Sequence, residues 1–134
     1  FGCPSNAIIT PHPGEAAMLL DCSVEELQKN RLEAAKELYK RYNCLIILKG
    51  YQTIVFDGEA YQCTDGGPAL STAGTGDVLA GLIGSFLAQG LSKIDAARFS
   101  VAIHGAAGDK FSKNKGVRGL TATKLIKIIN EEML

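Results

Sequence analysis

The chain has 134 residues, 46% of them hydrophobic and 21% charged, which is the size and composition of an ordinary soluble globular domain. Its 14 Lys and Arg residues balance 14 Asp and Glu residues, so the charge argues against nucleic acid or an anionic membrane as a partner. No apolar run approaches the roughly 18 residues of a membrane span and the first four residues lack the layout of a signal peptide, so we expect one compact cytoplasmic domain over residues 1–134.

The first elements in chain order predict a strand, helix, strand unit. A short apolar run at residues 7–9 reads as a buried strand, and it ends at residues 10–14, where two prolines prevent further strand pairing. Residues 15–20 are predicted to form a short helix. Ser23, with Glu26 three residues later, has the pattern of a capping box and begins a longer helix that extends through Tyr42.

The next segment predicts a mixed sheet. Residues 44–48 are continuously apolar, as expected for a parallel strand that is covered on both faces. Residues 53–56 and 60–63 flank Asp57 and Gly58, the pattern of a hairpin with a tight turn.

The last part of the chain is predicted to be helical. Residues 77–89 are apolar almost all round, so we expect a buried helix that stops at Gly90. Ser92 and Asp95 begin another helix, which runs toward Phe111. Thr121 begins the last one, which reaches about residue 130.

The four cysteines show no metal-binding pattern. They lie apart in the sequence, with no Cys-x-x-Cys pair and no His nearby at zinc-ligand spacing: Cys3, Cys22, Cys44 and Cys63. We therefore expect reduced thiols that act as small buried side chains.

The turn Gly74-Thr75-Gly76-Asp77 is the first candidate for chemistry. Small residues lead directly into a helix, so backbone N–H groups at the positive end of the helix dipole are free to bind an anion. The Asp77 carboxylate can accept a proton from a hydroxyl beside a bound phosphate, as phosphoryl transfer requires. The alternative is that Asp77 only caps the helix. The sequence matches neither the Walker motif nor the dinucleotide fingerprint, which needs glycine at Leu79.

Two further polar segments follow predicted strands. The segment Lys49-Gly50-Tyr51-Gln52-Thr53 suits a nucleotide, because ligands of open α/β sheets bind at the carboxyl ends of strands. His12 is held between two prolines and can contact a substrate, with Glu15 in the first turn of the following helix. Each has a simpler alternative as a solvated surface residue. His104 is expected to be a hydrogen-bonded packing residue. We expect His12, Lys49 and Asp77 to converge at one edge of the sheet.

Four motifs, in this order and spacing, identify a family. They are Thr10-Pro11-His12-Pro13-Gly14-Glu15, Leu48-Lys49-Gly50 with Thr53, Gly74-Thr75-Gly76-Asp77-Val78-Leu79-Ala80-Gly81, and His104-Gly105-Ala106-Ala107-Gly108-Asp109. The chain resembles the NAD(P)H-hydrate dehydratases, which have a ribokinase-like fold. The resemblance implies a three-layer α/β/α fold with a mostly parallel sheet, of which this chain is the carboxyl-terminal half. The family domain is about twice this length.

The resemblance also implies a reaction. ADP or ATP drives the removal of water from hydrated NADH or NADPH (NADHX or NADPHX), which restores the cofactor and releases AMP or ADP and phosphate. Asp77 would be the base, and Gly74, Thr75 and Gly76 the anion hole. Lys49 to Thr53 and Gly76 would bind the adenine nucleotide, and His12 and Asp77 the hydrated substrate. Mg²⁺ would neutralise the phosphates, although no carboxylate cluster identifies its ligands.

One departure and two alternative functions remain open. The family usually has Gly-Asn-Pro-Gly-Met-Ala where this chain has Gly66-Gly67-Pro68-Ala69-Leu70-Ser71. A small-molecule kinase of the same fold, acting on a sugar or vitamin precursor, is one alternative. A non-catalytic nucleotide-binding or assembly module is the other. Half of a sheet exposes an apolar strand edge, which a soluble monomer should avoid. We therefore expect the sheet to be completed by a homo-oligomer or by an amino-terminal half outside this sequence.

Overall fold

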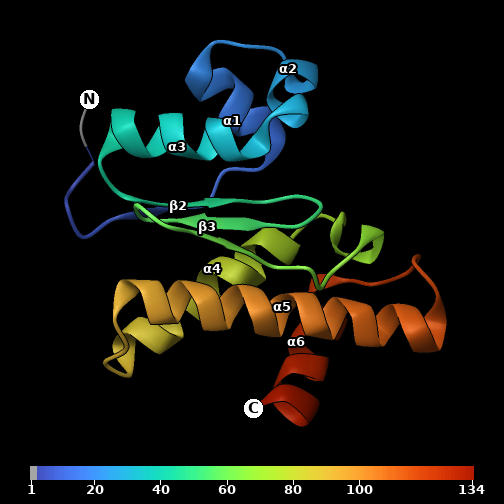
Figure 1. Cartoon of the computed structure of the whole chain (residues 1–134). Helices are drawn as coiled ribbons and strands as arrows, with labels where there is room; N and C mark the ends of the chain where they lie inside the picture. The colour runs from blue at the N-terminus through green and yellow to red at the C-terminus, as the bar shows by residue number, and fades with distance from the viewer. Residues whose placement is uncertain (1–2) are drawn as a thin grey trace. The chain divides into compact units, whose positions relative to one another are not determined.

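The computed structural model describes residues 3–134, which form two compact units. The first unit runs to Gln62 and the second is Cys63–Leu134. In Figure 1 the first unit is coloured from blue to green and the second from green to red. Each unit is described by itself below.

The first unit contains a four-stranded sheet with the order β1-β2-β3-β4. Its strands are β1 (Ile8–Ile9), β2 (Leu45–Leu48), β3 (Ile54–Phe56) and β4 (Ala60–Gln62). Strand β1 pairs with β2 in parallel, whereas β2–β3 and β3–β4 are antiparallel because short hairpin loops join them. The predicted mixed sheet is confirmed, and among these strands its parallel part is limited to the β1–β2 pair.

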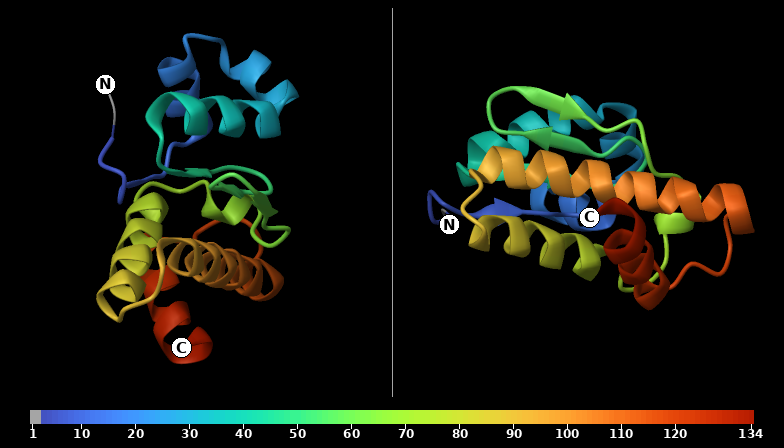
Figure 2. Two further views of the ribbon diagram at one scale, coloured as in Figure 1. Left: turned by 60° about the vertical axis from the view of Figure 1, so that its left-hand side comes forward. Right: turned by 90° about the horizontal axis from the view of Figure 1, so that it is seen from below.

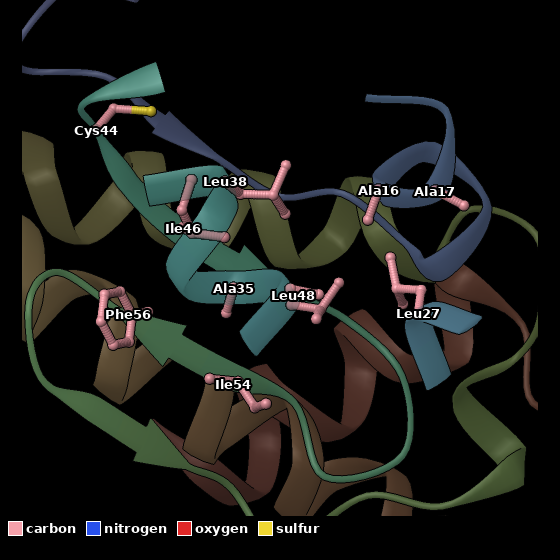
Figure 3. Close-up of a cluster of buried hydrophobic side chains, with 11 residues drawn as sticks. Ala16, Ala17, Leu27, Ala35, Leu38, Cys44, Ile46, Leu48, Ile54 and Phe56 are labelled. Carbon is pink, nitrogen blue, oxygen red and sulfur yellow. The ribbon is translucent and has the colours of Figure 1, made fainter. Parts of the chain in front are cut away.

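Three helices accompany this sheet: α1 (Pro13–Leu20), α2 (Val24–Lys29) and α3 (Arg31–Tyr42). Helix α3 packs on β2 and β3, and α1 packs beside α2 and α3. Figure 3 shows Leu38 of α3 close to Ile46 of β2 in the apolar cluster between helix and sheet. Tyr39 meets Phe56 edge to face, with ring centroids 5.3 Å apart. Burial of these side chains is the main stabilisation of the unit.

The prediction of one longer helix from Ser23 to Tyr42 is wrong. The Ser23 cap is present, since its hydroxyl accepts the N–H of Glu26 at 3.1 Å. The helix is interrupted at Asn30, whose φ of −147° and ψ of 68° lie outside the helical region. Asparagine favours such breaks because its side chain competes for local backbone hydrogen bonds. The result is two helices, α2 and α3, that change direction at Asn30.

The second unit is helical. It comprises a 3₁₀ turn η1 (Pro68–Leu70), the helices α4 (Thr75–Ala88), α5 (Lys93–Lys115) and α6 (Ala122–Ile128), and a terminal π-helical turn η2 (Ile129–Met133). Helices α4 and α5 lie side by side, and α6 contacts both (Figure 2). The predicted caps are confirmed, because Ser92 accepts the N–H of Asp95 and Thr121 accepts that of Lys124, each at 3.2 Å. Helix α4 ends as predicted at Gly90, which has a φ of +94°.

The prediction that α4 is a buried helix is wrong for the part of the chain that the structure describes. Only Thr75, Leu79 and Ile83 are buried. Small residues line the opposite side, and a Cβ atom added at Gly81 or Gly84 would meet open space. A uniformly apolar helix therefore uses one face for packing here and leaves the other exposed. None of the helices in residues 3–134 is long and apolar enough to cross a membrane.

Candidate functional site

Helix α4 begins at a glycine whose conformation and surroundings both require glycine. Gly74 is the N-cap residue, with φ +87° and ψ −13°, in the left-handed region that L side chains rarely adopt. A Cβ atom at this position would lie 3.1 Å from the Cβ of Ala122. Gly74 brings no side chain to cap the helix. The start of α4 is therefore open to an external ligand.

The first turn of α4 offers N–H donors at this opening. The N–H of Thr75 donates to the Thr72 carbonyl at 3.3 Å. The N–H groups of Gly76 and Asp77 occupy the second and third helical positions, where the helix itself provides no acceptor. They lie at the positive end of the dipole, and the exposed carboxylate of Asp77 is beside them. This arrangement can bind an anion and place a proton acceptor next to it.

Thr75 fixes the turn from the inside. Its side chain is only 5% exposed, and its Oγ1 lies 2.6 Å from the carbonyl oxygen of Leu70 and 2.8 Å from that of Thr72. Its own carbonyl oxygen is 2.9 Å from Nε2 of the buried His104, which therefore carries the proton and donates it. The expected hydrogen-bonded packing role of His104 agrees with this contact. The backbone donors that face a ligand are those of Gly76 and Asp77.

His12 is the N-cap residue of α1. Its Nδ1 accepts the N–H of Glu15 at 3.2 Å, and Glu15 Oε1 accepts the N–H of His12 at 3.0 Å, which completes a capping box. Nε2 of the same ring lies 3.2 Å from Glu15 Oε1. The ring folds back over Gly14, where an added Cβ would be 3.0 Å from its Cε1. Sequence reasoning missed this cap, because histidine is an unusual N-cap residue.

The segment Lys49–Thr53 is the hairpin loop between β2 and β3. Gly50 and Gln52 have φ values of +132° and +55°, and Thr53 Oγ1 donates to the Gly50 carbonyl at 3.2 Å. Tyr51 projects from the loop with 74% of its surface exposed. The N–H of Lys49 donates to the carbonyl of Pro11 at 3.0 Å, so this loop and the turn that holds His12 are joined.

Arg31 belongs to this site, although sequence reasoning did not identify it. Its Nη2 donates to the carbonyl oxygens of Leu48 and Lys49 at 3.2 and 3.3 Å, and its Nη1 to Gln28 at 2.9 Å. Burial lowers the pKa of the Arg31 guanidinium from its usual value. An added Cβ at Gly50 would lie 3.0 Å from Nη1. No sequence signal marks Arg31, because its position depends on the helix break at Asn30.

The structure thus groups the predicted site residues into two sets. His12 and the segment Lys49–Thr53 lie together in the first unit, whereas Gly74–Asp77 belongs to the second. The expected convergence of His12, Lys49 and Asp77 remains a prediction.

The cysteines and the carboxylates provide no metal centre in the described residues. All four cysteines are free, and Cys44 and Cys63 are buried. Burial raises the pKa of the Cys63 thiol, which also donates weakly to the carbonyls of Asp65 and Val101. Within residues 3–134, no three His, Cys, Asp or Glu side chains come together in a way that could hold a metal ion.

The fold is that of the ribokinase-like class. The chain matches a solved structure of a ribokinase-like superfamily protein from Enterococcus faecalis with a TM-score of 0.83 and 30% identity, covering 97% of this chain and 44% of that one. A family model described as NAD(P)H-hydrate dehydratase matches residues 2–131. The chain belongs to the NAD(P)H-hydrate dehydratase family, which confirms the resemblance found in the sequence.

Two further relatives place the match within longer proteins. The chain is 46% identical to the bifunctional NAD(P)H-hydrate repair enzyme Nnr of Escherichia coli, covering 96% of this chain and 26% of the relative. It matches the ADP/ATP-dependent NAD(P)H-hydrate dehydratase of Bacillus subtilis, co-crystallised with ATP and Mg²⁺, with a TM-score of 0.87 and 36% identity, covering 92% of this chain and 45% of that one. The chain thus spans about a quarter of the first relative and under half of the second.

Proposed function

We propose that the chain is the carboxyl-terminal half, residues 1–134, of one ribokinase-like domain that dehydrates NAD(P)H hydrate. The open start of α4 is the observation that carries this proposal. A glycine cap, two N–H donors without a helical acceptor and an exposed carboxylate occur within four residues, Gly74 to Asp77. Because the chain belongs to the NAD(P)H-hydrate dehydratase family, we assign NADHX or NADPHX as the substrate on which this turn acts.

The chemistry follows that of a kinase in its first step. A nucleoside phosphate, ADP or ATP, transfers its terminal phosphoryl group to the added hydroxyl of the hydrated nicotinamide ring. Asp77 accepts the hydroxyl proton, and the N–H groups of Gly76 and Asp77 stabilise the charge on the phosphoryl oxygens. Phosphate then leaves with the hydroxyl oxygen, a ring proton is lost, and the double bond returns. The products are NAD(P)H, phosphate and AMP or ADP.

We assign the two loops of the first unit to ligand binding. The segment Lys49–Thr53 holds the adenine nucleotide, with the Lys49 cation and the loop N–H groups as its contacts, and His12 contacts the hydrated substrate. Mg²⁺ accompanies the nucleotide, as it does in the Bacillus subtilis crystals. We assign it no protein ligand, and in sites of this kind phosphate oxygens and water supply most of the coordination.

The site is completed by polypeptide outside this sequence. Further strands and helices, or a second subunit, would supply the other wall of the substrate pocket, and the exposed face of α4 supports this. We place the protein in the cytoplasm, because four free cysteines suit a reducing compartment.

The direct test uses the full-length gene product that contains this chain. NADHX is supplied with ADP or with ATP in the presence of Mg²⁺, while NADH absorbance and released phosphate are followed. Formation of NADH and phosphate in equal amounts supports the proposal. No NADH with either nucleotide overturns it. In that case, phosphorylation of a sugar or vitamin precursor would indicate a kinase, and nucleotide binding without turnover a non-catalytic module.

A further inference from the structure

The motif His104-Gly105-Ala106-Ala107-Gly108 on α5 has no role in the chemistry described above. We propose that His104, Gly105 and Gly108 are positioning residues that hold the Gly74–Asp77 turn in its anion-binding geometry. This inference rests on the proposed function of that turn, and it adds a second element to the site. All the contacts that carry it lie within the second unit.

Gly105 allows the backbone of Asp65 to touch helix α5. A Cβ atom added at Gly105 would lie 2.7 Å from the carbonyl oxygen of Asp65 and 2.9 Å from its carbonyl carbon. These atoms are backbone and cannot move away as a flexible side chain can. Gly66 contributes from the other side, since its added Cβ would lie 3.1 Å from the Cα of Gly105. The close approach therefore depends on glycine in both segments, at position 66 and at position 105.

Gly108, one turn further along α5, packs directly against the side chain of Leu70. An added Cβ at Gly108 would lie 2.6 Å from Cγ of Leu70 and 2.9 Å from each of its methyl carbons. Glycine weakens a helix relative to alanine, so two glycines three residues apart in a 23-residue helix need a packing reason. The segment from Asp65 to Leu70 is that reason, because it lies directly against α5.

Leu70 connects this packing to the phosphoryl-binding turn. Its carbonyl oxygen accepts the hydroxyl of Thr75 at 2.6 Å, and the carbonyl oxygen of Thr75 accepts Nε2–H of His104 at 2.9 Å. The contacts form a closed path from α5 through Leu70 to Thr75 and back to α5. The next two residues after Thr75 carry the N–H donors. Their direction is therefore set by α5 rather than by the exposed loop alone.

This arrangement is what transition-state stabilisation requires. Backbone donors contribute most when they are fixed before the charge develops, and removing one donor from such a site typically lowers kcat by about 10²-fold or more. A displacement of the turn by about 1 Å has effects of similar size. Binding of the whole nucleotide draws on many other contacts. A loosened turn should therefore lower kcat more than it weakens nucleotide binding.

The test compares substitutions of His104 in the full-length gene product. In His104→Leu the donor to Thr75 is lost, and in His104→Gln an amide N–H replaces it at similar reach. We expect kcat to fall about 10- to 100-fold in His104→Leu with little change in the nucleotide KM, and to recover largely in His104→Gln. Loss of kcat and gain of KM in both variants, or no change in either, would overturn the proposal.

Glycine substitutions test the packing side of the argument. Gly105→Ala and Gly108→Ala should lower kcat, because each added methyl group would displace the segment from Asp65 to Leu70. Because Gly105→Ala can impair folding, Thr75→Ser and Thr75→Val provide a second pair that keeps or removes the hydroxyl. Equal activity in this second pair counts against the proposal.

Amide hydrogen exchange separates this inference from the proposed reaction. The amides of Thr75 and Val78 flank the two donors and are hydrogen-bonded to the Thr72 and Gly74 carbonyls, so their exchange should be faster in His104→Leu than in the wild type, while exchange in α6 is unchanged. This result would stand even if the wild type failed to dehydrate NADHX. Unchanged exchange at Thr75 and Val78 would reject the positioning role whatever the activity.

Discussion

The backbone N–H of Lys49 donates a hydrogen bond of 3.0 Å to the carbonyl oxygen of Pro11. Because β1 and β2 are parallel, the segments that follow them leave the same edge of the sheet, and this bond joins them directly. The turn that holds His12 and the loop that begins at Lys49 are consequently one structural element. A change that displaces either segment should affect binding at the other.

The position of Arg31 predicts that its side chain holds this loop in place. Arg31→Met removes the donors to the Leu48 and Lys49 carbonyls, and Arg31→Lys keeps the charge but loses the planar fork. Hydrogen bonds from a charged donor contribute about 1.5–3 kcal/mol, so nucleotide affinity should fall by about 10-fold or more in Arg31→Met, with partial loss in Arg31→Lys. Titration with a fluorescent adenine nucleotide measures this.

Arg41 provides the control on the same helix. It also donates to a backbone carbonyl, that of Leu19 at 3.3 Å, but it is exposed and near the other end of α3. Arg41→Met should leave nucleotide affinity unchanged. Equal losses in Arg31→Met and Arg41→Met would mean that general destabilisation, and not loop position, causes the effect.

The capping box predicts a separation of two roles of His12. His12→Ala removes the acceptor for the Glu15 N–H and should lower the free energy of unfolding by about 1 kcal/mol, whereas His12→Asn keeps a capping oxygen and most of the stability. If His12 also contacts the substrate, both variants lose activity with NADHX. Denaturant unfolding and steady-state kinetics on the two variants measure the two roles.

Ser23→Ala is the matched control for His12, since Ser23 caps the next helix in the same way. It should cost similar stability and leave kcat and KM unchanged. Full activity in His12→Asn would confine His12 to capping and reject substrate contact.

The helix starts show how far the sequence alone determines the site. Ser92 and Thr121 were predicted as caps and act as caps, because a hydroxyl followed by a free N–H is a local pattern. The uncapped start of α4 at Gly74 was predicted for the same reason, since glycine and small residues leave backbone donors open, and anion binding there stays a prediction. Local chemistry of this kind needs no knowledge of distant contacts.

Arg31 and Gly108 show what the sequence did not determine. Arg31 reaches Leu48 from the start of α3, just after a helix break at Asn30 that no periodicity in residues 24–42 reveals. Gly108 is required only because Leu70, 38 positions away, lies against it. Both depend on contacts between segments far apart in the chain, where tertiary packing overrides local preference.

Asp77 predicts the clearest loss of catalysis. Asp77→Asn keeps size and shape but removes the proton acceptor, so kcat should fall by about 10²-fold or more while the Kd of the nucleotide stays close to that of the wild type. The coupled NADH and phosphate assay with ADP or ATP gives kcat, and calorimetry gives the Kd.

The control for Asp77 is Asp95, the third residue of α5 as Asp77 is the third residue of α4. Each carboxylate complements a helix dipole, so Asp95→Asn and Asp77→Asn should cost a similar amount of stability, about 0.3–1 kcal/mol. Only Asp77→Asn should affect turnover. A near-normal rate in Asp77→Asn would show that Asp77 is a helix cap and no base.

The buried thiol of Cys63 predicts a dependence of stability on alkaline pH. Burial raises its pKa in the folded state, so above the ordinary thiol pKa of about 8.5 the unfolded chain loses this proton while the folded chain keeps it. The contribution of Cys63 to the free energy of unfolding is complete below that pH, and it is lost as the pH rises through the pKa of the thiol in the folded protein. The difference in the free energy of unfolding between wild type and Cys63→Ala should therefore shrink as the pH rises above about 8.5. A difference that stays constant as the pH rises above that value would contradict the raised pKa of Cys63. Alkylation of the native protein checks the burial independently, because half-buried Cys22 should be modified before Cys63.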